Sequence, residues 1–83
     1  MTSPVFERVR GIAADVLNVP GAAITAETSP ESIEAWDSLQ HLNLILALEQ
    51  EFGVQFEPEE IDQMNRIDRI LVVVQGKIDH AAH

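Results

Sequence analysis

The segment from Asp37 to Gly53 constrains the fold of this chain more than any other, because it carries signals that begin and end a helix. Asp37 is a good N-cap residue, and Gln40, three residues later, completes a capping-box-like pattern. Gly53 lies where a left-handed C-terminal cap is expected. We therefore predict an amphipathic helix over residues 38–52, with Ser38 at its first position. Its predicted buried face consists of Leu39, Leu42, Ile45, Leu46, Leu48 and Phe52.

Apolar residues elsewhere in the chain also recur at three- and four-residue steps, which predicts further helices. A first helix is expected after a cap at Thr2 or Ser3, with Pro4 in its first turn. It should end near Asn18. Its predicted apolar stripe is Val5, Val9, Ile12 and Val16, flanked by Phe6, Ala13 and Leu17.

Two more helices are expected in the C-terminal third of the chain. Pro58, in the first turn of an acidic segment, predicts a short helix from which Ile61 and Met64 face inward. Asn65 is expected to cap a last helix. The apolar residues of that helix are Ile67, Ile70, Leu71, Val74 and Ile78. The β-branched residues 72–74 would also suit a strand, but the flanking periodicity favours a helix.

A polar segment over about residues 22–36 separates the first two long helices. Ile24, Ile33 and Trp36 are expected to hold this loop against the core, although Trp36 could instead contact a partner. With no credible pair of strands, we predict an all-α fold: a small four-helix bundle with three main helices, one short helix and a long loop between helices 1 and 2. Residues 1–83 are expected to form one domain with a frayed C-terminal tail.

Acidic residues dominate the charge of this chain. Fourteen acidic and five basic residues give a formal charge of −9, and the eleven carboxylates between Gly11 and Asn65 have no Lys or Arg among them. This distribution disfavours nucleic-acid binding and favours a basic patch on a protein partner, although acidity could serve solubility alone. Without cysteine, a secretory signal or a bilayer-length apolar stretch, we expect a soluble, cytoplasmic protein that is a monomer.

Ser38 is the side chain best placed to carry a covalently attached group. At a helix start, free backbone N–H groups and the helix dipole favour an anion, and a phosphate fits best. His41 lies one turn away, but a Ser–His hydrolase would also need a support for the imidazole, an oxyanion hole and a cleft. We therefore expect His41 on the solvent face and no catalytic residue. No metal site is predicted, because His80 and His83 lack zinc-site spacing and the acidic run around Pro58 lacks the glycine of a calcium loop.

These features together resemble the acyl carrier protein family over almost the whole chain. The similarity rests on the triplet Asp37-Ser38-Leu39 at the start of the second helix, the Ala-Leu-Glu-x-Glu-Phe pattern of residues 47–52 and the matching order of helices. The resemblance implies that a phosphopantetheinyl transferase attaches 4′-phosphopantetheine from coenzyme A to Ser38, with help from Asp37. The thiol of this arm would then carry acyl groups as thioesters to acyl-ligating, acyl-transferring or condensing enzymes.

The resemblance also implies roles for the surface and the interior of the bundle. The family usually docks partners on its second helix. The expected docking residues here are Gln40, His41, Asn43, Glu49, Glu59 and Glu60. An aliphatic chain could be sheltered inside the bundle. The candidate residues for such an acyl pocket are Leu42, Leu46, Phe52, Ile61 and Leu71.

Two departures from the family pattern predict a specialised, stand-alone carrier. Ala35-Trp36 precedes the triplet where carriers of ordinary fatty acid synthesis usually have Gly and a small or aliphatic residue. The exposed face after Ser38 is also poor in acidic residues, while Arg66 and Arg69 add positive charge nearby. A fatty-acid-like, lipid or secondary-metabolite pathway is expected. The alternatives are an aminoacyl, peptidyl or polyketide carrier, and an unmodified acidic helical module that binds proteins.

Overall fold

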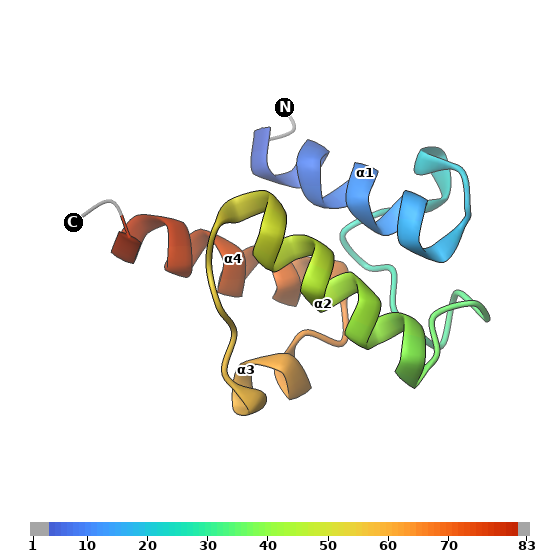
Figure 1. Cartoon of the computed structure of the whole chain (residues 1–83). Coiled ribbons are helices and arrows are strands. Elements are labelled where there is room, and N and C mark those ends of the chain that lie inside the picture. The colour runs from blue at the N-terminus through green and yellow to red at the C-terminus, as the bar shows by residue number, and fades with distance from the viewer. Residues whose placement is uncertain (1–3, 82–83) are drawn as a thin grey trace.

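Four α-helices and one short 3-10 helix make up the structure (Figure 1). The computed structural model describes residues 4–81, apart from the side chains of residues 80 and 81. The elements in chain order are α1 (Pro4–Leu17), η1 (Gly21–Ala23), α2 (Ser38–Phe52), α3 (Pro58–Gln63) and α4 (Ile67–Ala81). No strand occurs within residues 4–81, and the predicted all-α fold with its long loop is confirmed. The predicted caps Thr2 and Ser3, and the tail histidines His80 and His83 as side chains, lie outside the described residues.

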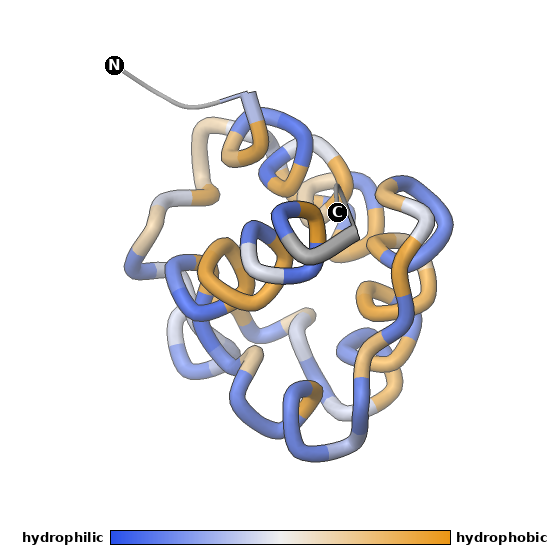
Figure 2. The backbone as a smooth tube through the Cα atoms, turned by 90° about the vertical axis from the view of Figure 1, so that its left-hand side faces the viewer, coloured by the Kyte–Doolittle hydropathy of each residue, from blue (hydrophilic) through white to orange (hydrophobic). Residues whose placement is uncertain are grey.

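The helices pack around one core. α1 contacts both α2 and α4, and α3 contacts α4. Figure 1 shows the long loop at the end of the bundle where α1 ends and α2 begins. Polar and apolar residues alternate along each helix in Figure 2, as expected for helices that bury one side. The start of α2, and with it Ser38, therefore lies beside this loop.

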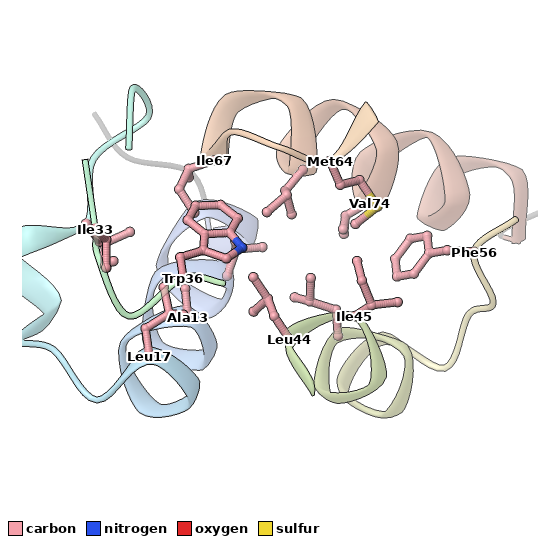
Figure 3. Packing of buried hydrophobic residues seen from close by; sticks show 14 residues of the cluster. Ala13, Leu17, Ile33, Trp36, Leu44, Ile45, Phe56, Met64, Ile67 and Val74 are labelled. Atoms are coloured by element: carbon pink, nitrogen blue, oxygen red, sulfur yellow. The ribbon is translucent and has the colours of Figure 1, made fainter. Parts of the chain in front are cut away.

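Buried apolar residues from α1, α2 and α4, from the long loop and from the segments on either side of α3 form the core (Figure 3). They are Val9, Ala13, Leu17, Ile24, Ile33, Trp36, Leu44, Ile45, Leu48, Phe56, Met64, Ile67, Ile70 and Val74. In the view of Figure 3 the Trp36 ring lies between Ile67 of α4 and Ala13 of α1. The prediction that Ile24, Ile33 and Trp36 hold the loop against the core is confirmed.

The predicted buried face of α2 is wrong for half of its members. Ile45 and Leu48 are buried and Phe52 is half-buried, but Leu39, Leu42 and Leu46 are 66%, 54% and 56% exposed. Leu44, which the prediction omitted, is fully buried. Apolar residues occupy two sides of this helix, so periodicity alone could not show which side faces α1 and α4. Packing selects the side of Leu44 and Leu48.

The apolar stripe of α1 is also centred differently from the prediction. Val9, Ala13 and Leu17, spaced four residues apart, are buried. Val5, Ile12 and Val16 lie on the flank and are half-buried. The helix ends as expected at Asn18, which adopts a left-handed conformation with φ of 57°. All the predicted residues are therefore at least half-buried. How deeply each one is buried depends on how α1 is rotated against its neighbours.

The long loop is tied to the start of α4 by backbone hydrogen bonds. The N–H groups of Ile67 and Asp68 donate to the carbonyl groups of Thr28 and Ala26, at 3.0 and 2.9 Å. The first turn of a helix leaves such donors unpaired, and here the loop accepts from them. The predicted cap at Asn65 is therefore wrong, because α4 begins at Ile67 and the loop carbonyl groups satisfy its first amides.

Candidate functional site

Ser38 is exposed at the first position of α2, as predicted. Asp37 is the N-cap: its Oδ1 accepts from the backbone N–H of Gln40 at 2.9 Å. The reciprocal half of the predicted capping box is not formed. The Gln40 side-chain oxygen accepts from Asn43 Nδ2 at 3.1 Å, and the Asp37 N–H donates to the carbonyl of Ala35. The Asp37 carboxylate therefore holds the helix start in place directly beside the Ser38 hydroxyl.

A surface hollow of about 570 Å³ lies beside this serine, and we call it the Ser38 hollow. It is formed by the loop, by the first turns of α2 and by α3. Its lining residues are Pro30, Trp36, Asp37, Ser38, His41, Leu42, Ile61, Asp62 and Asn65. Another hollow, of about 310 Å³, lies on α4 between Gln63 and Val73 and is lined by no hydroxyl group. The hydroxyl at the start of α2 thus opens onto a recess of mixed polar and apolar chemistry.

His41 joins three elements at the floor of the Ser38 hollow. The Trp36 indole Nε1–H donates to His41 Nδ1 at 3.0 Å, and His41 Nε2 lies 3.1 Å from the carbonyl oxygen of Ile61. An indole N–H can only donate, so Nδ1 must be the acceptor, and a neutral ring with its proton on Nε2 satisfies both bonds. The two rings are also stacked, with centroids 6.0 Å apart. We call this arrangement the Trp36–His41–Ile61 bridge.

The predicted solvent-facing position of His41 is wrong, since its side chain is half-buried. A sequence signal for this was present: His41 lies three and four residues before the buried Leu44 and Ile45, on the same side of the helix. Trp36, in contrast, is 2% exposed, as expected of a core anchor. Because both ring nitrogens of His41 are engaged by other groups, the imidazole is not positioned as a base for Ser38.

The expected docking residues fall into two groups. Asn43 and Glu59 are exposed, and Gln40 is half-buried at the start of α2. The other acidic members stabilise the fold: Glu49 accepts from the Phe56 N–H at 2.8 Å. Glu60 accepts from the Glu57 N–H and pairs with Lys77, both at 2.8 Å. The Glu57 N–H and, to a smaller extent, Lys77 lower the pKa of the Glu60 carboxyl.

The positive charge expected near the docking area is partly offset. Arg66 donates to Asp68 through Nε at 2.8 Å, and this bond lowers the pKa of the Asp68 carboxyl. The three exposed leucines Leu39, Leu42 and Leu46 lie instead along one side of α2, beginning next to Ser38. We call this surface the leucine stripe. The exposed side of α2 is therefore more apolar than the sequence led us to expect.

The five acyl-pocket candidates do not surround one cavity. Leu42 and Ile61 line the Ser38 hollow, whereas Leu71 of α4 lines a separate hollow together with Val5 of α1. Leu46 is exposed. The guanidinium carbon of Arg8 lies 4.8 Å from the centroid of the Phe52 ring. This expectation placed Leu42 and Leu46 inside the bundle, and the packing of α2 turns them outward.

The described part of the chain holds no group of three or more His, Cys, Asp or Glu residues arranged to bind a metal ion. Among the helices of residues 4–81, none combines the length and apolar character that crossing a bilayer requires.

Comparisons with known proteins show the family of this chain. Residues 7–71 match the family described as "Phosphopantetheine attachment site". The acyl carrier protein of Thermosynechococcus vestitus is 36% identical over 77 residues, covering 92% of this chain and 94% of that protein. The acyl carrier protein of Clostridium acetobutylicum is 34% identical over 72 residues, covering 87% and 94%.

The fold is also similar to that of a solved acyl carrier protein structure. The solution NMR structure of holo acyl carrier protein from Geobacter metallireducens superimposes with a TM-score of 0.86 at 29% identity, covering 96% of this chain and 92% of that one. The chain therefore belongs to the acyl carrier protein family: it is a carrier rather than an enzyme, and its cofactor is covalently attached 4′-phosphopantetheine.

Proposed function

We propose that Ser38 is the residue to which the phosphopantetheine arm is attached. The support is positional: Ser38 is an exposed hydroxyl, on the first residue of a 15-residue helix, at the rim of a hollow. Phosphate oxygens are favoured at such a helix start by the free N–H groups and the helix dipole. The mixed lining of the Ser38 hollow also suits an arm that contains both amide and methyl groups.

Three other hydroxyl groups in residues 7–71, those of Thr25, Thr28 and Ser32, form hydrogen bonds within the loop. Thr28 is buried and its Oγ1 accepts from the Thr25 N–H at 2.8 Å. Ser32 Oγ accepts from the Ser29 N–H and donates to the Ser29 carbonyl, both at 2.9 Å. These bonds compete with modification, because each hydroxyl holds a turn. Ser38 carries no such structural duty in the described part of the chain.

The arm supplies a thiol that holds an acyl group as a thioester. The residues of this chain present that arm: Asp37 fixes the start of α2, and the bundle gives the attachment point a rigid base. Tethering raises the effective concentration of the acyl group near a partner's active site. We propose that the partners are a phosphopantetheinyl transferase and a dedicated set of acyl-ligating, acyl-transferring or condensing enzymes.

The proposed docking surface is centred on the leucine stripe, with Gln40, Asn43 and Glu59 around it. Exposed leucines in a row beside the attachment residue are typical of a surface that a partner covers. Leu46→Ala should slow the modification of Ser38 without altering its final extent. Gln50→Ala, at another exposed position of α2, should leave the rate of modification unchanged. Equal labelling rates of the two variants would remove Leu46 from the surface that the transferase uses.

The attachment residue can be tested by intact-mass measurement. Incubation with coenzyme A and a phosphopantetheinyl transferase should add the mass of one arm to the protein. Ser38→Ala should abolish this gain, whereas the matched variant Ser32→Ala should retain it. A Ser38→Ala protein that still gains one arm would place the attachment elsewhere, and no gain in the folded native chain would favour an unmodified binding module.

A further inference from the structure

We infer that the Trp36–His41–Ile61 bridge closes the bundle core beneath Ser38, so that the acyl group carried by this protein is short enough to remain outside the core. The inference rests on the proposed attachment at Ser38 and adds the size class of the cargo. It replaces the expectation of an acyl pocket among the core residues. His41 is a positioning residue in this arrangement, since it acts by holding Trp36 and α3 in place.

His41 bonds across both boundaries of α2 that border the Ser38 hollow. One boundary lies between α2 and the preceding loop, where the indole of Trp36 donates to His41 Nδ1 at 3.0 Å. The other lies between α2 and α3, where His41 Nε2 bonds to the carbonyl of Ile61 at 3.1 Å. A chain that started at Ser38 and passed between these elements would have to separate the groups that form these bonds.

The space behind the bridge is occupied by core side chains. Trp36 is only 2% exposed and belongs to the same cluster as Leu44, Met64 and Ile67, each of which is 0% exposed. Protein interiors are close-packed, so an inserted chain must displace side chains. Displacing Trp36 would also leave its buried N–H without the Nδ1 acceptor, which is unfavourable.

The Ser38 hollow itself is an open surface recess with a mixed lining, so it would bury a long aliphatic chain only in part. Beside the apolar side chains of Pro30, Trp36, Leu42 and Ile61, its lining includes the carboxylates of Asp37 and Asp62, the amide of Asn65 and the imidazole of His41. An aliphatic chain gains free energy by leaving water for apolar surroundings, and these polar groups reduce that gain. A short acyl group requires no such burial.

The test compares two cargoes on the intact protein. Acetyl- and octanoyl-pantetheine arms are attached from the corresponding acyl-coenzyme A by a transferase, and loading is verified by intact mass. We expect the Trp36 indole N–H and the amides of Leu44, Met64 and Ile67 to give the same proton–nitrogen NMR signals in both forms. The melting temperatures should agree within about 1 °C, because nothing is added to the folded core.

Selective shifts of these core signals in the octanoyl form, with a melting temperature several degrees above that of the acetyl form, would overturn the inference. His41→Ala provides a second comparison: the octanoyl arm should now shift the Trp36 indole signal, and in the control Gln50→Ala it should not. Equal responses of the two variants would show that His41 does not close the core. If His41→Ala fails to fold, the wild-type comparison decides alone. Failure to load either arm would instead overturn the proposed attachment at Ser38.

Discussion

The two sides of α2 carry the same kind of side chain in opposite surroundings. Leu44 and Leu48 are fully buried against the rest of the bundle, whereas Leu42 and Leu46, two residues before each of them, are more than half exposed. The two sets differ in direction by roughly 160–200°, since each residue of a helix advances by about 100°. Chemical identity therefore says little about role in this helix; the direction of each side chain decides it.

This difference separates stability from recognition within one helix. The inner leucines lose their water contact on folding and stabilise the bundle. The leucine stripe gains little from folding and keeps apolar area in water next to Ser38. A row of apolar side chains at the proposed attachment residue is understandable if a partner protein covers it during transfer. The bridge at His41 lies on the inner side, in the first turn of α2, and connects the site to the core.

The largest expected effect contrasts a leucine from each side. Leu48→Ala should lower the free energy of unfolding by about 2–5 kcal/mol, because it removes buried methyl groups and leaves a cavity. Leu46→Ala should change it by less than about 0.5 kcal/mol, because that side chain is already exposed. Urea denaturation followed by circular dichroism measures both. Similar losses in the two variants would contradict the assignment of inner and outer sides.

A smaller effect is expected at the bridge. His41→Phe keeps a ring of comparable size but offers no acceptor to the Trp36 N–H and no donor to Ile61, so unfolding should become easier by about 1–3 kcal/mol. Asn43→Ala, which removes only an exposed hydrogen bond to Gln40, should have an effect below about 0.5 kcal/mol. If His41→Phe were as stable as Asn43→Ala, the bridge would contribute nothing measurable to the fold.

Asp37→Ala should cost about 1 kcal/mol, because the side-chain acceptor for the Gln40 N–H is lost from the start of α2. Asp37→Asn retains a good capping side chain and should keep most of this stability. Labelling of Ser38 should slow in Asp37→Ala. Comparing the labelling rates of the two variants by mass spectrometry separates the effect of the cap from that of the charge, and unchanged rates in both would exclude Asp37 from the site.

The smallest effect concerns the outer surface and its dependence on pH. The Glu57 N–H and Lys77 lower the pKa of the Glu60 carboxyl in the folded protein. The stabilisation by ionised Glu60 is therefore fully present above the ordinary pKa of a glutamate and is lost as pH falls through the lowered value. Melting curves of wild-type and Glu60→Gln protein should converge in acid. If the melting temperatures of the two proteins still differed at pH values below the lowered pKa of Glu60, ionisation of Glu60 would not explain the difference.

Much of the fold could be predicted from local signals. The cap at Asp37, the left-handed Gly53 and Pro58 in the first turn of α3 act within one turn of chain, and the structure has all three where the sequence placed them. The start of α4 could not be predicted in the same way, because its first amides bond to carbonyl groups of a loop about 40 residues earlier. The hydroxyl of Ser38 at a helix start was likewise a local prediction, but the recess beside it was not.

The sequence by itself determined that this chain forms a small bundle of helices, that Ser38 begins the second long helix, and that the chain resembles acyl carrier proteins. These conclusions depend on short-range hydrogen bonds and on spacing, which neighbouring residues encode. The tertiary structure alone decided which leucines of α2 face water and that His41 joins Trp36 to Ile61. Those features depend on how each helix is rotated against the others, and that rotation minimises exposed apolar area over the whole core rather than within one segment.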